Sequence, residues 1–343
     1  MNMKNCILLS LSLLVLSSCS DRQFTLEDKN DIGADRTLPV RMSVGEAFLK
    51  SAVQTADDMD GRTFYVYAFR KHEKADYRVT ATEDRGYCLL DSSIDGMTEN
   101  IGGKSVTYDS DSQFVRFNGK SVNWPNGECH KDAYDFFAYY TDGAEVKAVS
   151  RGEDIVTVSF TIDGTQDIML AKAALTKKQS GNLNAADKEA ATAYSFSHFC
   201  AFRNIYPAFT FAHCLAKLDF EIVTQNGVEV ENVSVLSPRN ARLTVAAKDE
   251  SMLGISFTDS KSIWNIDGTE AERYAIELDG ECLMLAPSGK YRLYATVLDN
   301  GTRKVLSTDF TGKSNEFTGG KEYKMKITVK GSGTKDLTVQ QTN

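Results

Sequence analysis

The sequence predicts an all-β protein made of two tandem β-sandwich domains. Short runs in which apolar and polar residues alternate recur along the 343 residues, and turn-forming pairs such as Asn118-Gly119 and Asp163-Gly164 separate them. No long segment with a helical period competes with this pattern. A hydrophobic content of 42% is ordinary for a globular protein, so the chain can bury a core.

The first residues resemble a bacterial lipoprotein signal. Lys4 precedes an apolar run at residues 7–16 that is too short to span a bilayer as a helix. Small residues, Ser17 and Ser18, then precede Cys19, whose thiol would take diacylglycerol. We therefore expect a signal peptide at residues 1–18 and a mature chain that acylated Cys19 attaches to outer-membrane lipid. An ordinary secretory signal that ends near a cysteine is the alternative.

A polar, acidic stretch at residues 19–37 follows the signal and shows neither a helix nor a strand period. Such a composition is typical of a tether or a removable pro-segment. We expect it to link the lipid anchor to the first domain.

Strand patterns then define an N-terminal domain at residues 38–205. Residues 63–69 and 134–140 are aromatic and β-branched, which suits a pleated surface. Residues 154–162 place Val156, Val158 and Phe160 on one face and threonine or serine on the other. Before the next domain, residues 171–194 form an excursion in which the Ala-rich stretch 185–194 predicts one short helix and residues 180–182 predict a loop.

The C-terminal domain is expected at residues 206–330. Its clearest strand is 322–330, where apolar residues alternate with charged ones, as in a sheet with one solvated face. A tail at residues 331–343 follows, with a glycine-rich hinge at 331–333 and a short alternating run of Leu337, Thr338 and Val339. This run is a candidate donor strand that could reach another molecule.

Composition and motifs exclude several functions. A formal net charge of -8 lacks the basic patch that nucleic acid requires. Neither a G-x-S-x-G elbow nor an HExxH or CxxC motif occurs, so we expect no enzyme, no metal and no cofactor. Histidines lie near cysteines at three places. Adjacent residues on a strand point to opposite faces, so Cys129-His130 and His213-Cys214 cannot easily chelate one ion, and only His198 and Cys200, two residues apart, would share a face.

The cysteines and the aromatic strands leave two questions open. Five of the seven cysteines remain after the signal and the lipidated residue, and most should be small buried apolar residues, although one disulfide could form: Cys88, Cys129, Cys200, Cys214 and Cys282. Four tyrosines could stack on sugar rings if exposed, but burial of both strand faces is favoured: Tyr65, Tyr67, Tyr139 and Tyr140. A monomeric glycan-binding lipoprotein is therefore the alternative function.

Several motifs in order resemble the fimbrillin-like (Mfa-like, type V pilin) lipoproteins of Bacteroidales over residues 38–340. Thr141 stands where that family often has proline, and the excursion before Phe211 is longer than usual. The motifs are Asn123-Trp124-Pro125, residues 134–140, Asp167-Ile168-Met169-Leu170-Ala171, residues 211–220, and residues 317–323 leading into Ile327.

The resemblance implies a structural or adhesive subunit of a type V fimbria, with Greek-key, transthyretin-like sandwiches. A trypsin-like protease would cut after an arginine near the start of the first domain, Arg36 or Arg41, and remove the leading strand. A strand from another fimbrial subunit would then fill the apolar groove. A ligand on a host or bacterial surface would be a further partner. Stalk, tip and anchor roles stay open.

The mature N-terminus distinguishes these roles. Mass spectrometry of the protein from cells should find a start at Thr37 or Met42 for a processed subunit. A start at acylated Cys19 would instead indicate an anchor subunit or a lipoprotein outside the fimbria.

Overall fold

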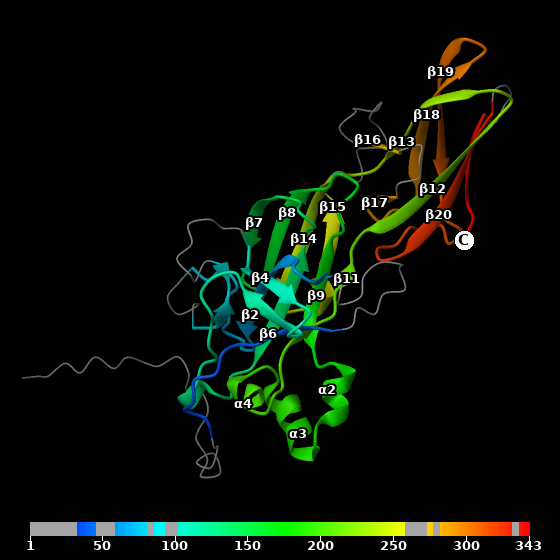
Figure 1. The fold of residues 1–343 in the computed structure, drawn as a ribbon. Helices are drawn as coiled ribbons and strands as arrows, with labels where there is room; N and C mark the ends of the chain where they lie inside the picture. The colour runs from blue at the N-terminus through cyan, green and yellow to red at the C-terminus, as the bar shows by residue number, and fades with distance from the viewer. Residues whose placement is uncertain are drawn as a thin grey trace, which may run out of the picture.

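The computed structural model describes residues 33–45, 59–80, 86–92, 102–257, 273–276, 282–330 and 336–343 (Figure 1). The predicted signal peptide, Cys19, most of the tether and the hinge at 331–333 lie outside these residues. The described chain is mostly β, with several sheets and a short helical segment. Within it, no helix has the length and apolar character needed to cross a membrane.

The first sheet nearly closes on itself. Its nine strands are β1 (Ser43–Val44), β2 (Thr63–Arg70), β3 (Cys88–Leu90), β4 (Lys104–Asp109), β5 (Phe114–Phe117), β6 (Tyr134–Tyr140), β9 (Met169–Ala174), β10 (Ala208–Phe209) and β11 (Ala212–His213). The order is β1-β10-β9-β6-β2-β4-β5, with β11 on β9 and β3 on β2. At the open side, the N–H of Val115 donates to the carbonyl of Met42 (2.9 Å), so β5 approaches β1.

A second sheet covers one face of the first. It contains β7 (Val146–Arg151), β8 (Ile155–Thr161), β14 (Asn240–Ala247) and β15 (Gly254–Phe257) in the order β15-β14-β8-β7. The 3-10 turn η5 (Glu250–Met252) lies between β14 and β15 along the chain. Tyr67 and Tyr139 of the first sheet share a core with Val158 and Leu243 of the second. The opposite face of the first sheet has its own core, which includes Phe136.

Two further four-stranded sheets form the other end of the molecule (Figure 1). One is β17-β12-β20-β21 and the other is β16-β13-β18-β19. The strand bounds are β12 (Ala216–Gln225), β13 (Glu229–Leu236), β16 (Arg273–Ala275), β17 (Leu283–Leu285), β18 (Tyr291–Asp299), β19 (Thr302–Phe310), β20 (Glu322–Lys330) and β21 (Leu337–Gln341). The alternation predicted for residues 322–330 matches β20, where Met325 and Ile327 are buried and Lys324 is exposed.

The path of the chain between the two ends was not predicted. After β13, the β14–β15 hairpin returns to the first end and pairs with β8, with Leu243 opposite Val158. Residues 240–257 therefore lie in a sheet with β7 and β8, although the predicted division at 205 and 206 groups them with the C-terminal strands. Apolar alternation identifies a strand but not its partner, and this explains the difference.

Three short helices precede β10, and in Figure 1 they lie beside one end of the first sheet: α2 (Lys177–Asn182), α3 (Ala185–Tyr194) and α4 (His198–Ala201). The predicted helix at 185–194 coincides with α3. The predicted loop at 180–182 is wrong, because these residues end α2. A capping box between Thr176 and Gln179 starts that helix and outweighs the loop composition of Ser180 and Gly181. A 3-10 turn, η4 (Gly127–Cys129), lies before β6.

Burial of the aromatic strands is confirmed. Tyr67 and Tyr139 are fully buried and Tyr140 is 7% exposed, while Tyr65 is half-buried. The hydroxyl of Tyr139 donates to the carbonyl of Gly102 (2.5 Å), inside the core. Tyr67, Tyr139 and Tyr140 therefore present no stacking face to a sugar, because both faces of β2 and β6 contact other apolar groups.

Replacing Tyr139 with alanine should destabilise the fold, because this ring fills the core and does not bind a ligand. The cavity left in the core should lower the free energy of unfolding by about 4 kcal/mol. Tyr139→Phe keeps the ring and loses one hydrogen bond, at a cost of about 1 kcal/mol. Denaturant melts of both variants check this, and a Tyr139→Ala protein as stable as Tyr139→Phe would contradict the placement of this ring.

Candidate functional site

The segment at residues 38–45, here called the leading segment, lies with one side in the core of the first sheet. Val40 is 4% exposed and Met42 is fully buried, and both belong to the core cluster on that face of the sheet. Leu38 and Val44 are half-buried against the same cluster. This alternation of inward side chains is that of an extended strand, although only Ser43 and Val44 are assigned to β1.

Backbone hydrogen bonds join the leading segment to three neighbours. The N–H of Val40 donates to Val122 (2.8 Å), and the N–H of Trp124 donates to Leu38 (2.9 Å). Further along, Val115 of β5 bonds Met42, and β1 pairs in parallel with β10. The segment therefore fills the space between β5 and β10 and satisfies backbone groups on both sides.

The two predicted cleavage residues lie in different surroundings. Both Arg36 and Arg41 are exposed. Arg36 is in a bend, where its N–H donates to Gly33 (3.0 Å) and its carbonyl lies 2.6 Å from Nε2 of His198. The Arg41 guanidinium lies over the ring of Phe114, 5.7 Å from the centroid.

The histidines have protein partners instead of a shared ion. His198 contacts Arg36 as above, Nδ1 of His130 lies 2.6 Å from the Gly127 carbonyl, and Nδ1 of His213 lies 2.6 Å from an oxygen of Asp167. Among the residues that the structure describes, no group of three metal-ligating side chains converges. The imidazoles of His198 and His213 each contact a residue distant in the sequence, whereas His130 contacts a residue three positions before it.

Four of the described cysteines are free, and the fifth, Cys129, is disulfide-bonded to none of them. Cys88, Cys200, Cys214 and Cys282 are free thiols, so no disulfide forms among these four and Cys129. Burial raises the pKa of the Cys88 and Cys200 thiols, which disfavours the reactive thiolate. Both side chains serve as small buried groups, as the sequence predicted.

The predicted donor residues form β21 at the edge of their own sheet. β21 runs antiparallel to β20, and Ile327 lies opposite Val339. Leu337 is 7% exposed, and Val339 is half-buried against the same core. The last residue also binds β20, since the Lys324 N–H donates to the Asn343 side chain (2.9 Å). The tail is therefore docked in this uncleaved chain.

The leading segment and β21 lie at opposite ends of the molecule (Figure 1). The former closes the nine-stranded sheet, and the latter edges a four-stranded sheet at the other end. A tail in this arrangement cannot occupy the place of its own leading segment without a large rearrangement.

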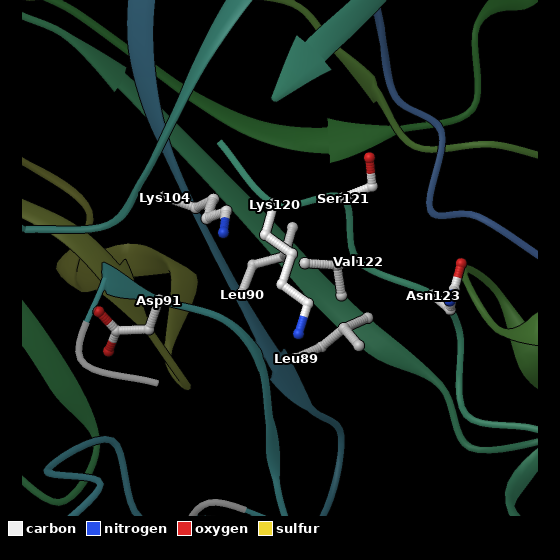
Figure 2. A pocket seen from close by; sticks show the side chains of 8 residues that line it. All are labelled: Leu89, Leu90, Asp91, Lys104, Lys120, Ser121, Val122 and Asn123. Carbon is white, nitrogen blue, oxygen red and sulfur yellow. The ribbon is translucent and has the colours of Figure 1, made fainter. Parts of the chain in front are cut away.

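A pocket of about 350 Å³ lies beside residues 120–123, the irregular stretch whose residues Val122 and Asn123 pair with the leading segment (Figure 2). The side chains of Lys104, Lys120 and Asn123 line it together with apolar residues of β3. Asp91 also lines it, but forms a buried ion pair with Arg151 (2.6 Å). The pocket brings together neither a nucleophile with a base nor a set of metal ligands.

Sequence comparison matches residues 79–342 to the family described as Fimbrillin-like. The chain belongs to the fimbrillin-like family. This confirms the resemblance seen in the sequence, and the family comprises fimbrial and adhesive structural proteins and not enzymes. Search of curated proteins finds no match.

Structure comparison matches solved structures that are distant in sequence. A candidate cell adhesion protein from Bacteroides uniformis is 16% identical, with a TM-score of 0.48, over 90% of this chain and 97% of its own. The tip fimbrial protein Mfa3 from Porphyromonas gingivalis is 8% identical, with a TM-score of 0.35, over 89% of this chain and 100% of its own. A fimbrial protein from Bacteroides ovatus is 11% identical, with a TM-score of 0.32, over 85% of this chain and 50% of its own.

The leading segment should contribute measurably to the stability of this fimbrillin-like chain. Met42→Ala removes a fully buried side chain and should lower the free energy of unfolding by about 3 kcal/mol. Arg41→Ala, at the exposed neighbouring position, should change it by less than about 0.5 kcal/mol. Equal denaturation midpoints for the two variants would show that the segment does not pack as described.

Proposed function

We propose that this chain is a structural or adhesive subunit of a type V-like fimbria that assembles by strand exchange after export as a lipoprotein. The observation that carries the proposal is that the leading segment completes the first sheet as a separate extended strand. Arg41 lies within this segment and Arg36 lies before it, and both side chains are exposed. Family membership supports the fimbrial assignment.

Removing the leading segment would leave an incomplete sheet. The N–H groups of Val115 and Trp124 and the carbonyl of Val122 would lose their partners, next to vacated apolar sites. Unpaired edges beside an open core bind an added strand through both backbone pairing and side-chain burial. A strand from another copy would restore both, and repeated head-to-tail contacts of this kind give a filament.

The remaining parts of the chain fit the same role. Acylated Cys19 would hold the precursor at the outer membrane, and residues 19–37 would be the tether that cleavage removes or retains. Each pair of facing sheets would be a Greek-key, transthyretin-like sandwich, and the first domain would include residues 240–257 in addition to strands from 38–205. Partners would be other fimbrial subunits and a ligand on a host or bacterial surface. A glycan-binding monomer is not proposed, because Tyr67, Tyr139 and Tyr140 are buried.

The donor in this proposal is β21. It is an edge strand with a single strand neighbour in its sheet, β20, so it can leave without dividing that sheet. Leu337 and Val339 supply the apolar side chains. The loss of five residues of pairing and of the Asn343 contacts opposes this release, and insertion into the next copy would offset that loss.

Deleting residues 335–343 should abolish assembly and leave a folded monomer. The core of the β12–β20 sheet keeps its central strands, so the melting temperature should fall by only a few degrees. Light scattering after treatment with an arginine-specific protease should then find oligomers for the full chain and monomers for the deletion variant.

A matched pair of point variants controls for the truncation. Val339→Asp places a charge at a half-buried donor position and should block assembly, whereas Gln340→Asp at the exposed neighbouring position should not. Polymerisation of the deletion variant, or of Val339→Asp at the full rate, would remove β21 as the donor.

A further inference from the structure

We infer that the pocket formed by β3, the start of β4 and residues 120–123 binds an acidic sugar residue, a sugar ring that carries a carboxylate or a sulfate. Lys104 and Lys120 would hold the anionic group. The inference rests on the proposed function and deepens its adhesive part, because it gives the chemical class of the surface ligand.

Lys104 occupies a position where the strand pattern expects an apolar residue. It begins β4 and lies on the same side of that strand as Val106 and Tyr108, which belong to the core of the first sheet. Lys104 is only 6% exposed, and its ammonium lies over the ring of Phe117, 5.8 Å from the centroid. Lysine is rarely buried to this extent, because removing its charge from water costs free energy. Such a departure from the local pattern is typical of a functional position.

Polar side chains from a second segment line the same pocket. Lys120, Ser121 and Asn123 are exposed, and within the described chain no hydrogen bond or ion pair uses their side chains. Figure 2 shows Lys104 and Lys120 reaching from different segments toward the space beside Leu90. A ligand in this space would meet two ammonium groups, a hydroxyl and an amide.

The charges around the pocket favour an anion. Asp91 is the carboxylate among the described lining residues, and the Arg151 guanidinium holds it through contacts of 2.6 and 2.8 Å. Because Arg151 neutralises Asp91, the two lysines give the pocket a positive charge, although the whole chain has a formal net charge of -8. A cleft lined by one sign of charge attracts ligands of the opposite sign. An anionic group is therefore the chemical complement of this pocket.

The rest of the lining fits a sugar ring. Leu89 and Val122 are half-buried and offer apolar surface to the C–H groups of a ring. Ser121 and Asn123 can donate to and accept from its hydroxyls. The volume of about 350 Å³ is at the small end of the range for ligand pockets, roughly 300–1,000 Å³, so a single sugar residue would fill it. A bare inorganic anion would leave the apolar and the neutral polar groups without contacts.

Backbone pairing fixes the walls of the pocket before a ligand arrives. β3 and β4 both pair with β2, through Leu90 and Lys104 respectively. The Val122 carbonyl accepts a hydrogen bond from the N–H of Val40 (2.8 Å), which holds the stretch at residues 120–123. A ligand therefore does not have to order the backbone of the site when it binds, and this favours affinity.

Ligand-detected NMR titration of the full-length chain tests the ligand class. Glucuronic acid and sulfated glucose supply a ring with an anionic group, whereas glucose supplies the ring alone and acetate the carboxylate alone. We expect at least one of the acidic sugars to bind with a Kd about tenfold or more below those of glucose and acetate. Higher salt should weaken this binding, because it screens the lysine charges. Glucose that binds as well overturns the role of the lysines, and acetate that binds as well overturns the sugar assignment.

Variants with a matched control test the pocket itself. Lys120→Glu should raise the Kd of the acidic sugar by about tenfold or more. Lys188→Glu makes the same charge change at an exposed position of α3, outside the pocket lining, and should leave the Kd unchanged. Lys104→Met keeps the side-chain length without the charge and should also weaken binding. A denaturant melt shows whether that buried variant is folded, and the exposed Lys120 tests the pocket independently of it.

The result is separable from that of assembly, because binding is measured before any protease treatment. Equal Kd values for Lys120→Glu and Lys188→Glu, or no binding of either acidic sugar to the parent chain, overturn the pocket as a ligand site and leave the proposed strand exchange untouched. Absence of oligomers from the protease-treated parent chain overturns the strand exchange and leaves the binding result standing.

Discussion

The structure depends on completing a hydrogen-bonded ladder. The nine-stranded first sheet almost closes, and residues 38–45 supply the backbone groups and the apolar side chains for the remaining gap. In a sheet, each edge group without a partner favours pairing with whatever strand is available. The leading segment therefore does two things at once. It stabilises the first core, and it occupies the place where another chain would bind.

The uncleaved chain keeps both partners of the proposed exchange occupied. The leading segment closes the first sheet, and β21 is docked on β20 at the other end of the molecule. In the proposed exchange both would have to open before two copies could join, so the intact chain would be protected against early assembly. Because acceptor and donor lie at opposite ends, each added copy would present a new acceptor or donor, as an open head-to-tail filament requires.

Local sequence patterns predicted the elements better than their arrangement. The period-two alternation in β8 and β20 and the aromatic runs of β2 and β6 identified these strands, since side-chain direction on a strand is a local property. The return of β14 to β8 was not predictable, because its partner lies about eighty residues away in the chain. For the site, the candidate arginines and the candidate donor tail were named from sequence and stay predictions. The contact of His198 with Arg36, across 162 residues, carries no sequence signal.

Hydrogen exchange at the Trp124 amide tests the central claim most directly. This N–H donates to Leu38, so it reports whether the leading segment is in place. The account predicts a protected amide in the intact chain, fast exchange in cleaved monomers, and restored protection in assembled oligomers. An amide that stays equally protected in all three forms would contradict it, because the first sheet would then be complete without either strand.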